Sequence, residues 1–523
     1  MAKQSEGKHS DPIRGLRAAG KNEIKRGEDH RFGRMFPGLP RAKFGKTAAQ
    51  QEKNLEKLAA AMVSPFDKPK DGPDGEESGI PSLYTYFGQF IDHDLTFDPA
   101  ASFQKQKDPR ATEDFRTAAF DLDNIYGRGP GDQPYMYDAD GLSFTLGNPI
   151  TGGHVVAHDL QRSPVAGRAL IGDPRNDENA IVSQIQGLFL QFHNRVVGEQ
   201  SKRGKTNFDH IQRIVRRHYQ YLVLNDFLPR IVNAQVLNSF KTRGMYDRKK
   251  VTLYDHVKYP FMPVEFSVAG YRLGHSMVRP GYRLNDVVLV PIFPLPEKLQ
   301  PGFGEGLTGF DPLNADWGID WGRFIDIGVR AYGSMKDADD GKINVENMNR
   351  LQFAYRIDTA LVDPLGNLPP SIASKPASLA LRNLIRGAEF GLPSGQAVAA
   401  HLKLPVMKDK DILIGQGVDH PKPRLRDIVS VAGPAFKGNC PLWTYVLAEA
   451  MHFQKKVRIP VKGRKIITTP QLGPVGGRIV ASVFLGLMFR DKYSLLSEEP
   501  NWKPTGAKPY TLKDFVKFAT GQN

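Results

Sequence analysis

The 523-residue sequence predicts a mainly α-helical protein with little β-structure, built as one large domain. Long stretches carry apolar residues at helical spacing, whereas strand-like alternation is short and rare, as in 155–158. Segments with candidate chemistry are spread from residue 88 to residue 386. A site drawn from such distant segments requires them to fold together. We therefore expect one domain over residues 36–523, preceded by a flexible basic tail over residues 1–35.

The expected helices follow from apolar periodicity and from the stop signals that bound each run. A first, amphipathic helix is expected over residues 50–63. Segments rich in proline, such as 289–301 and 404–423, are expected to be irregular. The remaining expected helices cover residues 83–95, 181–203, 208–231, 262–278, 379–389, 441–454 and 477–491.

The composition excludes several classes of protein. Apolar residues make up 40% of the chain, which is enough for a large buried core. The single cysteine, Cys440, rules out an intrachain disulfide and fits a reducing compartment. No apolar leader segment occurs near the N-terminus, and the longest apolar run, 479–489, is too short to span a bilayer. We expect a protein without a transmembrane segment that is cytoplasmic or exported without a classical leader.

Positive charge is concentrated in two places. The formal net charge is +15, and residues 1–50 hold 12 Lys/Arg against 5 Asp/Glu. A second basic stretch runs from Lys455 to Lys465. Basic segments can attract nucleic acid or anionic membranes. Because no nucleic-acid-binding motif accompanies either segment, we expect a solvated basic surface and no nucleic-acid partner.

The densest candidate chemistry is in residues 88–94, with the sequence GQFIDHD. In a helix, Gln89, Asp92 and His93 lie at i, i+3 and i+4 and share one face, with Asp94 at its edge. Two carboxylates and an imidazole in a mostly apolar segment are costly to bury without partners. A half-exposed polar helix is the simpler interpretation of this segment alone, but partner residues occur downstream.

Three downstream segments supply those partners. Arg175 follows a proline that fixes its loop, so a permanent cation could be directed at a small ligand, with Glu178 facing the same cavity. His275 lies in an expected helix beside small residues that allow a flat ligand to approach. Asn383 carries an amide oxygen that could accept from an imidazole Nδ1–H and so set the basicity of a metal ligand.

Residues 117–123, with the sequence TAAFDLD, offer oxygen ligands at alternate positions. Hard oxygen donors at this spacing suit Ca²⁺, which takes six to eight of them. The segment lacks the glycine and the closing glutamate of an EF-hand, so that family is excluded.

Taken together, these segments resemble the animal-type haem peroxidases of the peroxidase–cyclooxygenase superfamily. The resemblance covers roughly residues 80 to 490, and several motifs in the same order make it specific. The absence of disulfides and of a leader indicates a bacterial member. The motifs are GQxxDHD (88–94), TxxxDxDxxYG (117–127), GDxRxxE (172–178), HNR (193–195), RxGH (272–275) and NxxR followed by GLP (383–393).

The resemblance implies a role for each matching residue. His93 corresponds to the distal acid–base histidine and Arg175 to the distal arginine. Gln89 corresponds to the distal glutamine that holds water or halide. His275 corresponds to the proximal iron ligand, and Asn383 to its hydrogen-bond partner.

Further residues match the family's cofactor contacts. Arg272 and Arg386 would neutralise haem propionates. Asp92 and Glu178 match the carboxylates that form ester bonds to haem methyl groups, so the resemblance implies haem b held covalently through both. The family's Ca²⁺ site, which would stabilise the helix that carries the distal histidine, is matched by Asp94, Thr117, Ala119 (backbone), Asp121 and Asp123.

The activity implied is a haem-dependent peroxidase, which reduces H₂O₂ by way of a ferryl intermediate and oxidises halide, thiocyanate or small phenolic donors. Asn179 stands where some members carry a haem-linked methionine, which puts chloride oxidation in doubt. A fatty-acid dioxygenase of the same superfamily is the nearest alternative. Its radical-forming tyrosine precedes the proximal histidine by three residues, where this chain has Arg272, with Tyr271 beside it. A haem-binding scaffold or adhesion module is a third possibility.

Overall fold

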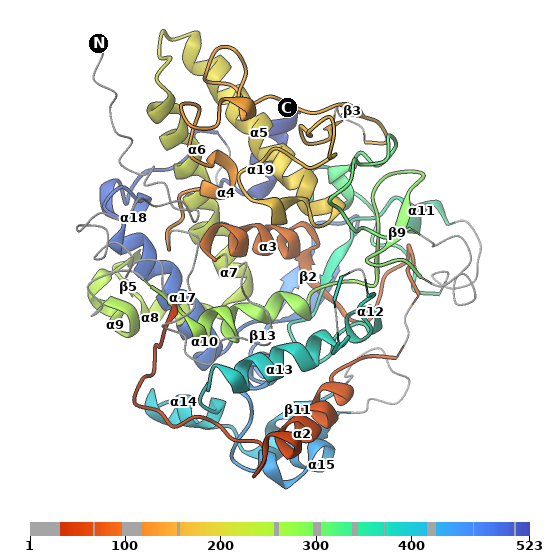
Figure 1. Cartoon of the computed structure of the whole chain (residues 1–523), viewed down its shortest axis with the longest axis vertical. Helices are drawn as coiled ribbons and strands as arrows, with labels where there is room; N and C mark the ends of the chain where they lie inside the picture. The colour runs from red at the N-terminus through yellow and green to blue at the C-terminus, as the bar shows by residue number, and fades with distance from the viewer. Residues whose placement is uncertain are drawn as a thin grey trace.

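The computed structural model describes residues 32–522, except 66–67, 97–117, 154–156, 256–260, 296–304, 337–343, 371, 374, 416–424, 464 and 507–508. The fold is mainly helical, as expected from the sequence. Figure 1 shows α3 (Leu83–Leu95) near the centre, with the segment that begins at α10 (Val264–Ser267) beneath it and α13 (Leu379–Glu389) below that. The candidate site residues come mainly from these three segments.

The other long helices surround this central group. Those that the sequence predicts end within about four residues of the predicted boundaries, whereas α8, α14, α15 and α19 were not predicted. The expected helix over 208–231 contains one π-helical turn, Val223–Phe227, between α6 and α7. The helices are α2 (Ala48–Ala61), α5 (Ala180–Ser201), α6 (Phe208–Leu222), α7 (Leu228–Ile231), α8 (Ala234–Ser239), α14 (Gly395–His401), α15 (Ile428–Ala432), α16 (Leu442–Ala450), α17 (Pro474–Arg490) and α19 (Leu512–Thr520).

Single-turn helices and strand pairs complete the fold. The short helices are α4 (Asp123–Tyr126), α9 (Thr252–Asp255), α11 (Val345–Met348), α12 (Asp363–Gly366) and α18 (Leu495–Glu498). Among the described residues, each sheet has two strands. The antiparallel pairs are β2 (Glu77–Pro81) with β10 (Phe353–Tyr355), β3 (Pro149–Ile150) with β4 (Ala157–His158), β5 (Lys241–Thr242) with β6 (Met245–Tyr246), β8 (Gly281–Arg283) with β9 (Leu289–Pro291), β11 (Leu413–Ile414) with β12 (Arg426–Asp427), and β13 (Gln454–Arg458) with β14 (Ile466–Pro470).

One expected helix, over residues 262–278, is wrong. Residues 262–278 do not form one α-helix: they contain β7 (Met262–Pro263), the single turn α10 and the 3-10 helix η7 (Gly270–His275). A 3-10 helix has three residues per turn, so Arg272 and His275 lie above one another on the same side. Pro263 and the glycines at 270 and 274 disfavour a long α-helix, and the apolar periodicity obscured them.

Aromatic packing fixes the central helix. The ring of Phe90 in α3 stacks on Phe189 in α5, with 4.4 Å between centroids, and meets Tyr219 in α6 edge to face at 6.2 Å. All three side chains are buried. These contacts position α3 against α5 and α6, so the opposite face of α3 is directed to the candidate site.

The N-terminal segment connects two elements of the site. β1 (Phe32–Gly33) pairs in parallel with β7, and the amide of Met35 donates to buried Glu265 in α10 at 2.9 Å. Arg34 donates to the carbonyl of Gly391, just beyond α13, at 3.2 Å. Packing therefore begins at Phe32, within the span expected to be a tail, whereas residues 1–31 lie outside the described residues.

Candidate functional site

The imidazole of His93 is buried on the inner face of α3. Its Nδ1 lies 2.8 Å from Oδ1 of Asn176, and the amide nitrogen of Asn176 donates to Oε1 of Gln186 in α5 at 2.7 Å. Asn176 and Gln186 are both fully buried. His93 is thus the first member of a chain of buried side chains that runs through η4 (Pro174–Asp177) into α5.

Gln89, Glu178 and Asn179 lie on the Nε2 side of His93. Gln89 donates its side-chain amide to Oε1 of Glu178, and Asn179 donates to Oε1 of Gln89 at 3.2 Å. The same Glu178 oxygen lies 3.5 Å from Nε2 of His93. The structure therefore brings together the predicted Gln89, His93 and Glu178, from two segments separated by more than 80 residues.

Arg175 is held by neighbours rather than directed alone into a cavity. Its Nη2 donates to Asp173 at 2.9 Å, to the carbonyl of His93 at 3.1 Å and to the carbonyl of Thr96. Burial opposes the charge, but Asp173 outweighs it and raises the pKa of Arg175 above its usual value. Asp92 and Glu178 act in the same direction, which indicates that both carboxylates lie near the guanidinium. Arg175 thus stays charged and fixes η4 against the end of α3.

The second predicted histidine has an amide partner of its own. The Asn383 amide nitrogen lies 2.8 Å from Nδ1 of His275, and the Asn383 amide oxygen accepts from Nη1 of Arg272 at 3.1 Å. His275 and Asn383, which the sequence analysis pairs, lie within hydrogen-bond distance. The amide has the opposite orientation from the expected one, because Arg272 takes its oxygen.

Two half-buried positive charges, Arg272 and Arg386, lie near this pair. Burial and the nearby charge of Arg386 lower the pKa of Arg272 to about 10, while Asp92 acts in the opposite direction. Burial and Arg272 lower the pKa of His275 to about 3, so its imidazole is neutral at physiological pH. Two guanidinium groups that disfavour each other's charge form a favourable setting for carboxylates of a ligand.

The two histidine segments are connected directly. The hydroxyl of Tyr271 in η7 donates to the carbonyl of Gly88 in α3 at 3.2 Å, and its ring stacks on Phe266 at 4.8 Å. Tyr271 is therefore engaged between the two segments. The carboxylate of Asp92 favours the charged form of both Arg272 and Arg175, so it acts on both sides of the site.

An acidic cluster lies next to His93. The carboxylates of Asp94, Asp121 and Asp123 lie within 4.8 Å of one another, and the side chain of Asp94 is fully buried. The hydroxyl of Tyr219 and the backbone of Leu122 favour its charged form but do not offset the burial. Burial, with Asp121 and Asp123, raises the pKa of Asp94 well above its usual value. Carboxylates in this arrangement require a cation or protons. Ala119 lies in the same loop, whereas Thr117 is outside the described residues.

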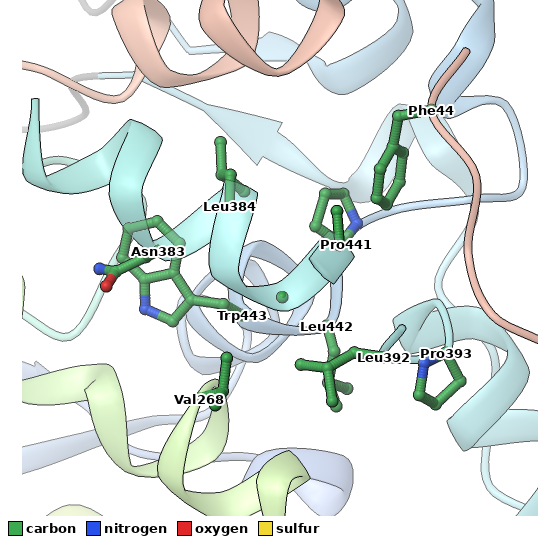
Figure 2. Close-up of a pocket in the computed structure, with 11 residues that line it drawn as sticks. Phe44, Val268, Asn383, Leu384, Leu392, Pro393, Pro441, Leu442 and Trp443 are labelled. Carbon is green, nitrogen blue, oxygen red and sulfur yellow. The ribbon is translucent and has the colours of Figure 1, made fainter. Parts of the chain in front are cut away.

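A hollow borders the Asn383 side of the site (Figure 2). It contains about 280 Å³ of space, part of which is open solvent, and its lining is mostly apolar. Trp443 and Asn383 both line it, and the indole of Trp443 donates to the carbonyl of Arg272 at 3.2 Å. His93 and Arg175 do not line it, so this hollow is separate from the His93 side of the site.

His193 occupies a packing position. It lies between the hydroxyl of Tyr126 at 3.0 Å and the carbonyl of Leu142 at 2.8 Å, and burial lowers its pKa to about 4. It therefore holds α5 against α4 as a neutral residue.

Sequence reasoning missed Asn176 and Gln186. Asn176 lies inside the recognised GDxRxxE segment, but at one of its variable positions. Gln186 is an amide in a largely apolar run, and a buried amide of that kind needs a partner, which was the available signal.

Comparison with known proteins also points to haem peroxidases. The family model for animal haem peroxidases matches residues 100–291. A peroxidase-like protein from Margaritifera margaritifera is 26% identical over 253 residues, 37% of this chain and 31% of that protein. Chorion peroxidase from Drosophila melanogaster is 30% identical over 132 residues, 23% of this chain and 16% of that protein. The matches thus span less than a third of these relatives' own length.

Solved structures show the same fold. Peroxidase A from Dictyostelium discoideum superposes with a TM-score of 0.62 at 15% identity, covering 94% of this chain and 93% of that one. The fatty acid alpha-dioxygenase of Oryza sativa superposes with a TM-score of 0.53 at 17% identity, covering 95% and 80%. No helix among the described residues is long and apolar enough to cross a membrane. The chain is thus similar to animal haem peroxidases over residues 100–291, and its fold is that of peroxidase A.

Proposed function

We propose that this protein is a haem peroxidase that reduces H₂O₂ and oxidises small donors. The observation that carries the proposal is the pair of histidines on facing segments, each hydrogen-bonded to an asparagine but set among different neighbours. His93 lies beside Gln89 and Glu178, which are suited to a small polar ligand. His275 lies beside Asn383 and Arg272, which are suited to a metal-bound cofactor with acidic groups.

The residues present fit haem b. His275 is neutral, as a metal ligand must be, and Arg272 and Arg386 are partly buried cations that would bind the propionates. Asp92 and Glu178 are half-buried carboxylates near the same site and would form the ester links. Haem would supply an iron that takes two oxidising equivalents from peroxide and returns them to a donor.

His93 supplies the acid–base chemistry. Its Nε2 would accept the proton of the peroxide oxygen that binds first, and would then deliver that proton to the departing oxygen. Arg175 stays charged through Asp173 and would stabilise negative charge that develops on the peroxide. Gln89, held by Glu178 and Asn179, would hold water or a halide.

The acidic cluster next to His93 is proposed to bind Ca²⁺. Asp94, Asp121 and Asp123 supply hard oxygen ligands, and the full burial of Asp94 beside two other carboxylates is the strongest indication. The Ala119 carbonyl and Thr117 would complete the set. Because Asp94 follows His93 directly, the cation would stabilise the end of α3 that carries the distal base.

The donors proposed are bromide, iodide, thiocyanate or small phenols. Asn179 bonds to Gln89 and cannot form a thioether-derived link to haem, so chloride is the less favoured halide. Fatty-acid dioxygenation is the second candidate, because the fold also matches an alpha-dioxygenase. It is disfavoured by Arg272 at the position of the radical tyrosine and by Tyr271, whose hydroxyl is engaged by Gly88.

The test compares two activities of the purified, haem-loaded chain. Peroxide-dependent oxidation of guaiacol and bromide is expected, without oxygen uptake on palmitic acid. Tyr271→Phe is expected to keep the peroxidase activity. Oxygen uptake on palmitic acid that disappears in Tyr271→Phe would establish the dioxygenase instead. Bound haem with neither activity would indicate a non-enzymatic scaffold.

A further inference from the structure

Two buried amides form a continuous hydrogen-bond chain behind His93. Asn176 Oδ1 lies 2.8 Å from Nδ1 of His93, and Asn176 Nδ2 donates to Gln186 Oε1 at 2.7 Å. Both amide side chains are completely buried, so water does not compete for these bonds. The chain begins at the proposed distal base and ends inside α5.

The chemistry of the three groups fixes where the imidazole proton lies. An amide oxygen only accepts, so the bond between His93 and Asn176 requires a proton on Nδ1. A neutral imidazole carries one N–H, and its other nitrogen is then a lone-pair acceptor. That nitrogen, Nε2, is the one on the side of Gln89 and Glu178.

We propose that Asn176 and Gln186 are positioning residues that hold His93 in the tautomer with its proton on Nδ1 and its basic nitrogen toward the peroxide. This proposal rests on the proposed peroxidase function for its catalytic consequence, but the two amides that hold the imidazole belong to the chain itself. Neither residue touches substrate; both act through His93.

Gln186 is needed because an asparagine amide can be turned over. If Asn176 alone reversed, its oxygen would face the Gln186 oxygen, and two acceptors would meet in a buried site. The second amide therefore couples to the first, so that the two can reverse only together. The competing arrangement reverses both amides and places the proton on Nε2, so it predicts a different tautomer.

The backbone holds the three groups in register. The side chain of Asp173 caps η4 by accepting from the amide of Arg175 at 2.9 Å. The side chain of Asn179 caps α5 by accepting from the amides of Ile181 at 3.1 Å and Val182 at 2.9 Å. Asn176 lies between these caps, so its position relative to Gln186 is set by two helix starts.

The test reads the His93 tautomer by ¹⁵N NMR of the histidine ring in the full-length protein, haem-loaded in its diamagnetic ferrous carbon monoxide form and again without haem. His93→Gln assigns the signal. The wild type and Asn176→Asp, which keeps an acceptor oxygen, are expected to carry the proton on Nδ1. Asn176→Leu and Gln186→Leu are expected to show Nε2–H, and their haem is expected to react with H₂O₂ about tenfold or more slowly.

Gln184→Leu is the matched control. Gln184 lies on the same helix, is buried, and bonds to the carbonyl of Trp317 and the amide of Ile319, away from His93. It is expected to lose thermal stability as Gln186→Leu does, with His93 unchanged. If Asn176→Leu does not fold, Gln186→Leu against Gln184→Leu carries the same comparison.

A wild-type proton on Nε2, or a Gln186→Leu variant with the wild-type tautomer and peroxide rate, would overturn the proposal. An equal effect of Gln184→Leu on the tautomer would overturn it as well. A wild type that binds no haem or does not react with peroxide would instead refute the proposed function, while the tautomer would still be read from the haem-free chain.

Discussion

Each side of the site pairs a histidine with an asparagine, but the two asparagine amides have opposite orientations. On the distal side, the oxygen of Asn176 faces Nδ1 of His93. On the proximal side, the nitrogen of Asn383 faces Nδ1 of His275, and the oxygen faces Arg272. Each histidine thus has a buried asparagine, but only the distal imidazole is offered an acceptor.

The difference shows on which side the chain alone holds the asparagine in the orientation that its histidine needs. The distal amide is held by Gln186, a second protein side chain. The proximal amide is held by Arg272, a residue proposed to bind a haem propionate. An imidazole that binds iron through Nε2 carries its proton on Nδ1 and needs an acceptor there. Cofactor binding would therefore draw Arg272 to the propionate and allow Asn383 to present its oxygen.

The largest effect is expected from removing the proximal ligand. His275→Ala should lose haem almost completely, because no other imidazole in the described proximal segment replaces it. Haem content per chain, from the Soret absorbance after gel filtration, measures this. His193→Gln, which alters a buried histidine that bonds to Tyr126 and Leu142, should retain haem. Full haem retention by His275→Ala would refute the proximal assignment.

Removing the distal base should leave haem in place and slow the chemistry. His93→Ala is expected to bind haem as the wild type does and to react with H₂O₂ about 10²–10⁴-fold more slowly, because the proton transfer loses its base. Stopped-flow absorbance at the Soret band measures the rate. If His93→Ala instead lost haem, the distal and proximal roles would have to be exchanged.

Calcium is expected to stabilise the distal side specifically. At 100 times its dissociation constant, Ca²⁺ should raise the free energy of unfolding by about 2.7 kcal/mol, measured by urea denaturation with and without EGTA. Asp94→Asn should abolish this increment, and Asp311→Asn, which alters an exposed acid, should not. An increment of equal size in Asp94→Asn would place the ion elsewhere.

The smallest effect is expected on haem affinity when each of the two asparagines is replaced. Asn383→Leu removes the proximal acceptor and should weaken haem binding by about 10–100-fold, whereas Asn176→Leu should leave haem affinity near the wild-type value. Competition for haem with apomyoglobin measures both affinities. Equal losses in the two variants would mean that the asparagines support the fold in the same way rather than serving different sides.

The sequence predicts the helices that carry the site where periodicity is strong. The expected ranges 83–95 and 379–389 coincide with α3 and α13. The segment of His275 was predicted wrongly as a long helix, because apolar spacing alone does not distinguish an α-helix from consecutive short turns. The strand β1 lies inside the expected tail and was not predicted. Its partner β7 is more than 200 residues away, and pairing over that distance leaves no local signal in the sequence.

The recognised motifs contain side chains that the fold brings together, but they do not predict how those side chains are oriented. Gln89, His93 and Glu178 meet as expected. The orientation of Asn383 and the pairing of Arg175 with Asp173 depend on which neighbour takes each donor, and that is decided by tertiary packing. Gln186 was missed because its partner lies in another element and its spacing follows no motif.

Electron paramagnetic resonance of the ferric, haem-loaded wild type tests the central claim most directly. If His275 alone ligates the iron and His93 stays free as the distal base, the spectrum should show high-spin ferric haem. The His275→Ala variant should lose that signal together with the haem. A low-spin spectrum typical of two imidazole ligands would contradict the account, because His93 would then be a ligand and not a base.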